Sequence, residues 1–259
     1  MPEPVRLEPS LRERVWGRTH LGPWYPDSDR PIGESWFLAG RDLPLLVKLI
    51  FTSERLSVQV HPDDGEDGPC GKTEMWHILE ADPSAAIALG FREPITRQRL
   101  REATSTGEIE QLLNWMPVKA GETYFTPAHT VHAIGAGIVL CEIQQNSDIT
   151  YRLWDYGRPR ELHVEKAVQI CDLGVHPGPA PRGEPVRSKH FVTEVVEMAG
   201  GDRVRPDAHE CQLWICIEGE ARIGSAAVRA GEVWLLPEEG PQPEVHSARG
   251  ARFLRTWVP

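Results

Sequence analysis

Cysteine is scarce in this chain of 259 residues, and its few copies follow no metal-binding pattern. The five cysteines include no Cys-x-x-Cys pair, which excludes the spacing of a structural zinc site. An odd, unpatterned set also argues against a disulfide framework and is typical of reduced thiols. We therefore expect a cytoplasmic protein.

The sequence also lacks a basic excess and a long apolar run. Its formal net charge of −10 argues against nucleic acid or an anionic membrane as a partner, because both require a basic face. The longest apolar run, Leu43 to Phe51, is interrupted by Lys48 and is too short to span a bilayer. No apolar stretch of the signal-peptide kind opens the chain. The overall charge would repel an anionic substrate, so a local group of Lys and Arg would have to hold one.

Glycine and proline are plentiful, at 23 residues each, and predict frequent turns between short strands. Leucines and an isoleucine among charges predict two short helices within 96–115, joined near Gly107, and another helical segment within 161–170. We therefore expect a mainly β protein. Runs of branched and aromatic residues predict strands at Leu45–Phe51, Leu56–His61, Trp76–Leu79, Ala85–Leu89, Thr123–Phe125, Ile138–Gln144, Phe191–Glu197, Leu213–Glu218, Ala221–Ile223, Val233–Leu236 and Phe253–Val258.

The second half of the chain resembles the first. Glu74-Met-Trp-His-Ile-Leu-Glu is matched by Gln212-Leu-Trp-Ile-Cys-Ile-Glu, and Gly121-Glu-Thr-Tyr-Phe by Gly231-Glu-Val-Trp-Leu. A duplicated β-unit of this kind predicts two jelly-roll barrels, with the helical insertion (about 96–115) in the first. We expect three parts: a metal-binding catalytic domain (1–173), a Pro- and Gly-rich linker (174–188) and a degenerate, metal-free second barrel (189–259).

Four polar residues of the first half predict a metal site. Gln59 and His61 alternate with apolar residues and so share one face of a strand, although a polar face open to water is the simpler interpretation of that pair alone. Glu74 has apolar neighbours, and His132 lies in a turn before an apolar strand. One shared cation would satisfy all four buried groups. Two imidazoles, a carboxylate and an amide oxygen suit Zn²⁺, and would also admit Mn²⁺, Fe²⁺, Co²⁺ or Ni²⁺.

Five motifs follow one another between about Trp16 and Arg158: Ile32-Gly-Glu-Ser-Trp, Leu56-Ser-Val-Gln-Val-His-Pro-Asp-Asp, Gly71-Lys-Thr-Glu-Met-Trp, Thr130-Val-His-Ala-Ile-Gly and Glu142-Ile-Gln-Gln-Asn-Ser-Asp-Ile-Thr-Tyr-Arg. Together they resemble the type I mannose-6-phosphate isomerases, most closely the short bacterial form. The C-terminal part resembles only a degenerate cupin repeat. The resemblance implies two cupin (jelly-roll) barrels, one bound zinc, and interconversion of mannose 6-phosphate and fructose 6-phosphate through an enediol.

The resemblance also implies residue roles. The family's metal ligands fall on Gln59, His61, Glu74 and His132, the four residues chosen above. Its phosphate-binding positions match Lys48 and Ser57 and, more loosely, Arg158. A lysine inside an apolar strand independently requires an anionic neighbour.

The remaining matched residues are candidates for catalysis. Glu142 is the expected base, which would move a proton between C1 and C2. Arg152 would stabilise the enediolate or assist ring opening, with Asp148 orienting it, and Lys72 should reach the neighbourhood of the metal. Each of them also has a plain structural interpretation, as a salt bridge or a solvated side chain.

One departure from the family pattern concerns the metal loop, and two alternatives remain open. His129 stands where the family usually has glycine, so it can alter substrate fit or compete for the metal. The alternatives are a non-catalytic sugar-binding or sensing cupin and a cupin metalloenzyme acting on another substrate, such as an Fe²⁺ dioxygenase. We expect a small sugar phosphate as the partner, and a monomer or homodimer.

Overall fold

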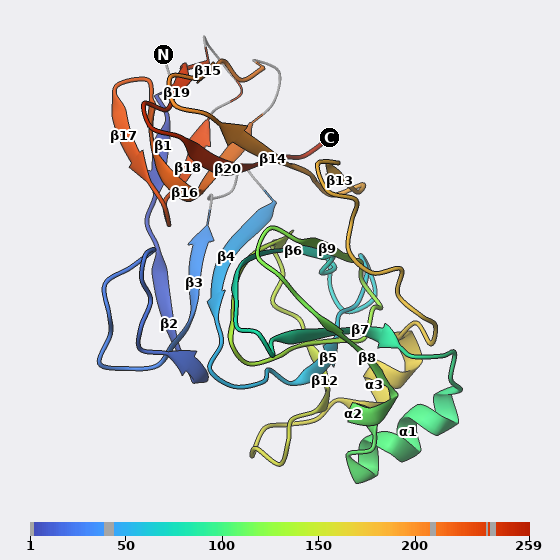
Figure 1. Ribbon diagram of the computed structural model, residues 1–259. Coiled ribbons are helices and arrows are strands. Elements are labelled where there is room, and N and C mark those ends of the chain that lie inside the picture. Colours follow the sequence, from blue (N-terminus) through green and yellow to red (C-terminus); the bar gives the residue numbers. More distant parts are fainter. Residues whose placement is uncertain (1–2, 39–43, 208–210, 237, 239–241) are drawn as a thin grey trace.

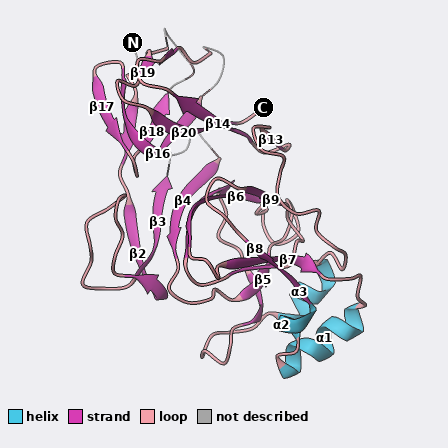
Figure 2. Ribbon diagram, viewed as in Figure 1, coloured by secondary structure: helices cyan, strands magenta, loops and turns pink. Residues whose placement is uncertain are grey.

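The structure, a computed structural model, describes residues 3–38, 44–207, 211–236, 238 and 242–259. It is mainly β with few helices, as predicted, and its described strands form three sheets. In Figure 1 the nine-stranded sheet lies at the top with both chain ends, above the six-stranded and five-stranded sheets. The helices gather at the opposite end, as Figure 2 shows. No helix in the described ranges is long and apolar enough to cross a membrane.

The six-stranded sheet is covered on both faces. One face packs on the nine-stranded sheet and the other on the five-stranded sheet, so every residue of its two central strands is buried. Strands covered on both faces read as continuous apolar runs, which explains why these two were predicted almost residue for residue. The sheet order is β2 (Ser10–Arg18), β3 (Ile32–Leu38), β4 (Leu45–Phe51), β11 (Ile138–Gln145), β6 (Glu74–Ala81) and β9 (Thr123–Thr126).

The five-stranded sheet carries the helices on its outer side through a shared apolar cluster. Thr96 caps the first helix by accepting from the backbone N–H of Arg99, and Gly107, at φ 80°, ends it. The two short helices joined near Gly107 are therefore confirmed. The sheet order is β12 (Tyr151–Trp154), β5 (Val58–Val60), β10 (His132–Ile134), β7 (Ala86–Phe91) and β8 (Leu113–Pro117); the helices are α1 (Arg97–Thr106), α2 (Ile109–Leu112) and α3 (Val164–Ile170).

The nine-stranded sheet is built from the C-terminal part of the chain together with one N-terminal strand. The predicted strands Leu213–Glu218 and Ala221–Ile223 are a single long strand, β16, because its hydrogen bonding continues through Gly219. Among the described strands, the pairings close none of the three sheets into a barrel. The strands are β1 (Val5–Leu7), β18 (Val233–Leu236), β16 (Gln212–Ile223), β20 (Ala251–Trp257), β14 (Val192–Met198) and β13 (Val186–Arg187), with β15 (Arg203–Val204), β17 (Ala226–Arg229) and β19 (Val245–His246) at its margin.

Candidate metal centre

A polar pocket of about 210 Å³ lies between the facing sides of the five-stranded and six-stranded sheets. Its volume is below the range of about 300–1,000 Å³ that is common for drug-sized ligands, which favours a small polar molecule. Two rows of cross-strand neighbours furnish its walls. On one sheet, Gln59 and Arg152 stand side by side on β5 and β12; His132 on β10, the other cross-strand neighbour of Gln59, is not among the described residues that line the pocket. On the other, Trp36, Lys48 and Glu142 stand side by side on β3, β4 and β11.

Three of the four predicted metal ligands converge. One ligand atom each from His61, Glu74 and His132 lies within 4.8 Å of the others. The Nε2 atoms of His61 and His132 lie 3.6 Å and 3.5 Å from the two oxygens of Glu74. All three side chains are at most 2% exposed. The structure thus brings together residues that are 71 positions apart in sequence, from the end of β5, from β6 and from β10.

Both histidines are held with an unprotonated ring nitrogen facing Glu74. The Nδ1–H group of His61 donates to the carbonyl of Ile149 (2.9 Å), and that of His132 to the carbonyl of Thr130 (2.8 Å). Backbone carbonyls only accept, so Nε2 of each ring keeps its lone pair. Burial lowers the pKa of His132 to about 4 and, helped by the charge of Lys72, lowers the pKa of His61 well below its ordinary value. The neutral imidazoles that result are the form that binds metal ions.

The carboxylate of Glu74 is fully buried and lacks the partners that such a group requires. Neither of its oxygens accepts a hydrogen bond of normal geometry from a described residue, although Lys72 Nζ lies 3.0 Å from one of them. Burial and the neighbouring charge of Glu142 raise the pKa of Glu74. A cation between Glu74 and the two imidazoles would satisfy all three groups, so these residues fit a divalent metal ion.

Gln59 is the fourth predicted ligand and borders the same position. Its amide Nε2 lies 3.3 Å from Nε2 of His132. The oxygen and nitrogen of a side-chain amide exchange places by a flip of the terminal torsion. After that flip the oxygen faces the ligand atoms, as metal binding requires.

Lys72 lies beside the ligands, as predicted. Its Nζ is 3.0 Å from His61 Nε2 and 3.0 Å from Glu74 Oε2, and its side chain is 5% exposed. Burial alone would lower the pKa of Lys72, but the carboxylates of Glu74 and Glu142 outweigh it and raise that pKa. The side chain is therefore a buried ammonium that also borders the pocket.

Glu142 lies on the pocket wall between two donors. Its Oε1 accepts from Lys48 Nζ and its Oε2 from Trp76 Nε1, both at 2.9 Å. Lys48 also donates to Gln144 and stands over the Trp36 ring, 4.7 Å from its centroid. Burial opposes ionisation of Glu142, but the charges of Lys48 and Lys72 prevail and lower its pKa. Glu142 is thus an ionised carboxylate inside the pocket.

The predicted phosphate-binding residues are placed differently from one another. Lys48 and Ser57 line the pocket, and both are buried. Arg158 is not among the described residues that line it, since its guanidinium binds Asp155 (2.8 Å) and the carbonyl of Arg55 (2.7 Å). The structure therefore does not bring the three together at one point.

Arg152 and Asp148 both line the pocket. Arg152 donates through Nη1 to the carbonyl of Glu161 (2.8 Å). An ion pair between Arg152 and Asp148 is not among those formed by the described residues. Asp148 itself is exposed at the pocket edge.

Six further polar or aromatic side chains on the pocket wall were not predicted as site residues. Arg14 and Glu34 form an ion pair of 2.6 Å across β2 and β3, and Trp36 follows on β3. Glu34 and Trp36 belong to the motif Ile32-Gly-Glu-Ser-Trp, whose polar residues stand out only once the strand is known to face the pocket. The others are Trp16, Thr150 and Arg160, the last in the turn after β12.

His129 points away from the ligands. Its backbone takes φ 72°, one of two such non-glycine values in the described residues, and its N–H donates to the carbonyl of His61 (2.9 Å). Its ring Nε2 contacts Glu66 at 2.8 Å. His129 is not in the group of described ligand atoms around Glu74. It joins two loops rather than entering the metal position.

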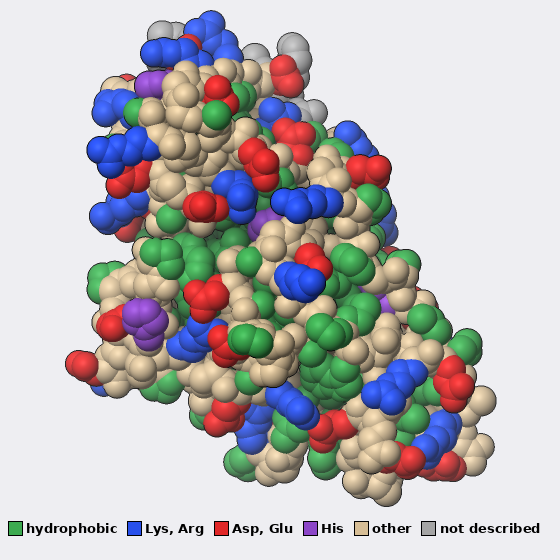
Figure 3. Space-filling model, in the orientation of Figure 1, with side chains coloured by type: hydrophobic (Ala, Val, Ile, Leu, Met, Phe, Trp, Pro, Cys, Tyr) green, Lys and Arg blue, Asp and Glu red, His purple; other side chains and the backbone are tan. Residues whose placement is uncertain are grey.

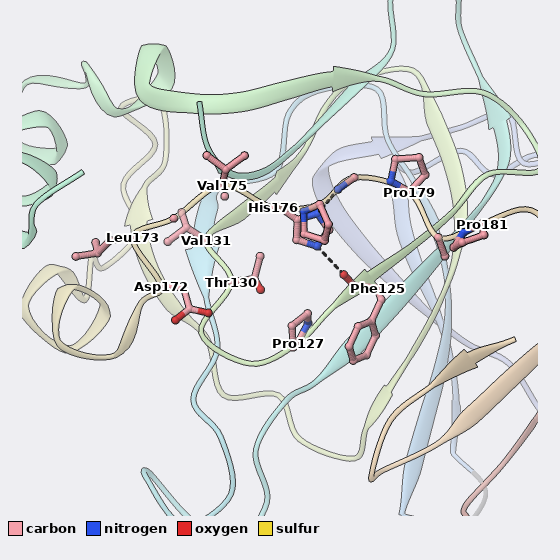
Figure 4. Close-up of a pocket in the computed structure, with 15 residues that line it drawn as sticks. Phe125, Pro127, Thr130, Val131, Asp172, Leu173, Val175, His176, Pro179 and Pro181 are labelled. Atoms are coloured by element: carbon pink, nitrogen blue, oxygen red, sulfur yellow. Dashed lines mark hydrogen bonds between the residues drawn. The ribbon is translucent and has the colours of Figure 1, made fainter. Parts of the chain in front are cut away.

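A larger cavity of about 530 Å³ lies behind the loop that carries His132, and Figure 4 shows its lining. Phe125, Val131 and the prolines of the 174–181 segment surround it. His176, the imidazole in its wall, is already hydrogen-bonded to the Phe125 carbonyl (2.8 Å) and to the N–H of Gly178 (3.1 Å). Its lining offers one carboxylate, Asp172, and this already bonded imidazole, so the smaller pocket is the better candidate for chemistry.

Charges on the outer surface and in the pocket are arranged differently. Acidic and basic side chains intermingle over the face seen in Figure 3. In the pocket, five cationic and three carboxylate side chains line the wall, an excess of two positive charges in a chain of net charge −10. The pocket thus meets the requirement for a local basic group at an anionic substrate.

The sequence and the structure both have named relatives. The chain is 34% identical to the mannose-6-phosphate isomerase ManA of Bacillus subtilis, over 66% of this chain and 69% of that protein. A crystal structure of the mannose 6-phosphate isomerase from Bacillus subtilis covers 98% of this chain and 99% of its own, with 25% identity and a TM-score of 0.86. A zinc-bound mannose 6-phosphate isomerase structure, 18% identical, has the same fold over 98% of this chain and 99% of its own, with a TM-score of 0.74. No protein-family model matches the sequence.

Proposed function

This chain belongs to the mannose-6-phosphate isomerase family, and we propose that it interconverts mannose 6-phosphate and fructose 6-phosphate with one bound divalent metal ion, Zn²⁺. The observation that carries the proposal is the buried Glu74 carboxylate between two neutral imidazoles, next to an ionised carboxylate on the pocket wall. Neither an Fe²⁺ dioxygenase nor a sensing cupin requires that second carboxylate as a general base. The zinc-bound structure of the same fold supports zinc as the ion.

Four residues would hold the metal: Gln59, His61, Glu74 and His132. When bound, the ion would polarise the substrate's carbonyl and hydroxyl oxygens and stabilise negative charge that develops on them. Two histidines, one carboxylate and a weak amide leave a position for a substrate oxygen. All other steps fall to the side chains of the pocket.

Glu142 would move the proton. Its carboxylate is ionised, so it can take a proton from C2 of the aldose and return it to C1 of the enediol. Lys72, a buried ammonium on the ligand side, would donate a proton to O1 as the enediol forms and take one back from O2 as the ketone forms. Arg152, one strand from Gln59, would steady the enediolate, with Asp148 at the pocket edge.

The two-unit architecture is also part of the proposal. We propose two cupin units, one over 1–173 with the helical insertion and a metal-free one over 189–259, joined by the 174–188 linker. The strand order β4-β11-β6-β9 corresponds to β14-β20-β16-β18, which supports a duplication. The N-terminal strand β1 belongs to the first unit in sequence but pairs with β18 of the second unit.

The decisive test is an isomerisation assay on purified, zinc-loaded protein. We expect fructose 6-phosphate to form from mannose 6-phosphate, and to stop forming after chelation or in His132→Ala. His20→Ala serves as the matched control, because His20 is an exposed histidine whose side chain is 78% accessible. An inactive wild-type protein that still holds one zinc ion per chain would contradict the proposed reaction.

A further inference from the structure

The five cations of the pocket wall are not equally neutralised. Three of them each face a carboxylate: Arg14 with Glu34 (2.6 Å), Lys48 with Glu142 (2.9 Å) and Lys72 with Glu74 (3.0 Å). The other two are Arg152 and Arg160, which line the pocket from β12 and the turn that follows it. Asp148, the remaining carboxylate of the wall, is exposed and forms no ion pair with either arginine among the described residues.

These two arginines differ in their carboxylate partners. No carboxylate pairs with Arg152 among the ion pairs of the described residues. Arg160 binds both oxygens of Asp155, but Asp155 also pairs with Arg158. One buried carboxylate thus serves two arginines, with a third close by. Burial and the charges of Arg160 and Arg158 lower the pKa of Arg152, against the opposing charges of Asp155 and Glu161.

Donors suited to an anion remain available on these two arginines. A guanidinium has five N–H groups. Asp155 accepts hydrogen bonds from two N–H groups of Arg160. The carbonyl of Glu161 accepts one from Arg152, and the Nε atom of Arg152 is buried with no hydrogen-bond partner among the described residues. The bidentate ion pair with Asp155 also fixes the plane of the Arg160 guanidinium, so its remaining N–H groups are held in one direction.

The position of these two arginines suits the far end of a hexose phosphate. Arg152 is the cross-strand neighbour of Gln59, and Gln59 is that of His132. The reacting carbons, C1 and C2, would lie at the metal ligands. The phosphate on C6 is at the opposite end of the carbon chain and would therefore extend toward β12 and the turn after it.

We propose that Arg160, fixed by Asp155, binds the substrate phosphate, and that Arg158 supports Asp155 without touching the substrate. This assignment rests on the proposed function, and it replaces the looser sequence match to Arg158. Arg152, the cross-strand neighbour of Gln59, lines the same pocket and adds its charge to it.

Arg160→Gln and Arg158→Gln form a matched pair, since each removes one arginine from Asp155 and only one of them faces the pocket. The probe is inorganic phosphate, titrated into the zinc-loaded protein and followed by calorimetry. We expect Arg160→Gln to weaken phosphate binding by roughly tenfold or more, the effect of losing charge-assisted hydrogen bonds. Arg158→Gln should weaken it by less than about threefold. Arg160→Lys keeps the charge but loses the bidentate geometry of the guanidinium, so its phosphate affinity should fall between those of the wild type and Arg160→Gln.

The same variants in the isomerase assay separate the two proposals. Arg160→Gln should raise KM for mannose 6-phosphate by about the factor seen with phosphate and change kcat little. Phosphate binding that depends on Arg160 in a protein that does not isomerise the sugar would overturn the proposed function alone. Equal effects of the two glutamine variants, a larger effect of Arg158→Gln, or no phosphate binding by the wild type would overturn the role of Arg160.

Discussion

The ammonium of Lys48 lies 2.9 Å from the carboxylate of Glu142, on the paired strands β4 and β11. Both side chains are at most 5% exposed. The pair explains how a charge is tolerated in the middle of Leu45–Phe51. It also places a cation against the carboxylate that we propose as the base, and so controls the pH range in which that base is ionised.

Replacing Lys48 should therefore shift the pH dependence of catalysis. In Lys48→Met the carboxylate loses its nearest cation, so the pKa of Glu142 rises and the protonated, inactive form persists to higher pH. We expect the acid limb of kcat/KM to move up by about 1–3 pH units. Lys48→Arg should return it toward the wild-type position. An acid limb that stays in place in Lys48→Met would show that Glu142 does not control it.

Removing the carboxylate of Glu142 should stop turnover without releasing the metal. Glu142→Gln keeps the shape of the side chain and is expected to lower kcat by about 10²- to 10⁴-fold, the range typical of a lost general base. Zinc content, measured on the same preparation, should remain that of the wild type. Glu122→Gln is the control, since Glu122 binds Tyr124 and the backbone of Lys119 outside the pocket. Near-normal turnover in Glu142→Gln would assign the proton transfer elsewhere.

His77 should make the protein less stable in mild acid. It is 2% exposed on the side of β6 opposite the metal, where it contacts Thr123, and burial lowers its pKa from 6.5 to about 4. Between these two pH values the unfolded chain binds a proton that the native protein does not, so stability falls as the pH falls through this window. The cost at pH 5 is about 2 kcal/mol.

The test compares denaturant unfolding of wild type and His77→Gln at pH 7 and pH 5. The variant should lose less stability between the two conditions than the wild type does. A loss equal to that of the wild type would mean that His77 is protonated in the native protein at pH 5.

Fold elements that are buried on both faces could be predicted from the sequence, and exposed or very short ones could not. Leu45–Phe51 and Ile138–Gln145 form continuous apolar runs. β2 was missed because it is an edge strand whose residues are mostly exposed and include four charged side chains. β10 has three residues, too few to show an alternating pattern. The pairing of β1 with β18 joins opposite ends of the chain, and no local pattern encodes it.

The same distinction holds for the site. Glu74 and Lys48 could be singled out because a charge among apolar residues needs a partner. In the structure two imidazoles lie next to Glu74, and Glu142 pairs with Lys48. Arg160 could not be singled out, because arginines in turns are usually solvated. Its relation to the pocket depends on how the turn after β12 folds back, which only the tertiary structure defines.

The central claim is that one metal ion, held by Glu74 and its neighbours, is required for isomerisation. The most direct measurement is turnover of metal-stripped protein as zinc is added back. We predict that turnover of mannose 6-phosphate rises in proportion to zinc and saturates at about one ion per chain, and that Glu74→Gln binds zinc more weakly and stays nearly inactive. Full turnover without metal, or wild-type activity in Glu74→Gln, would contradict the account.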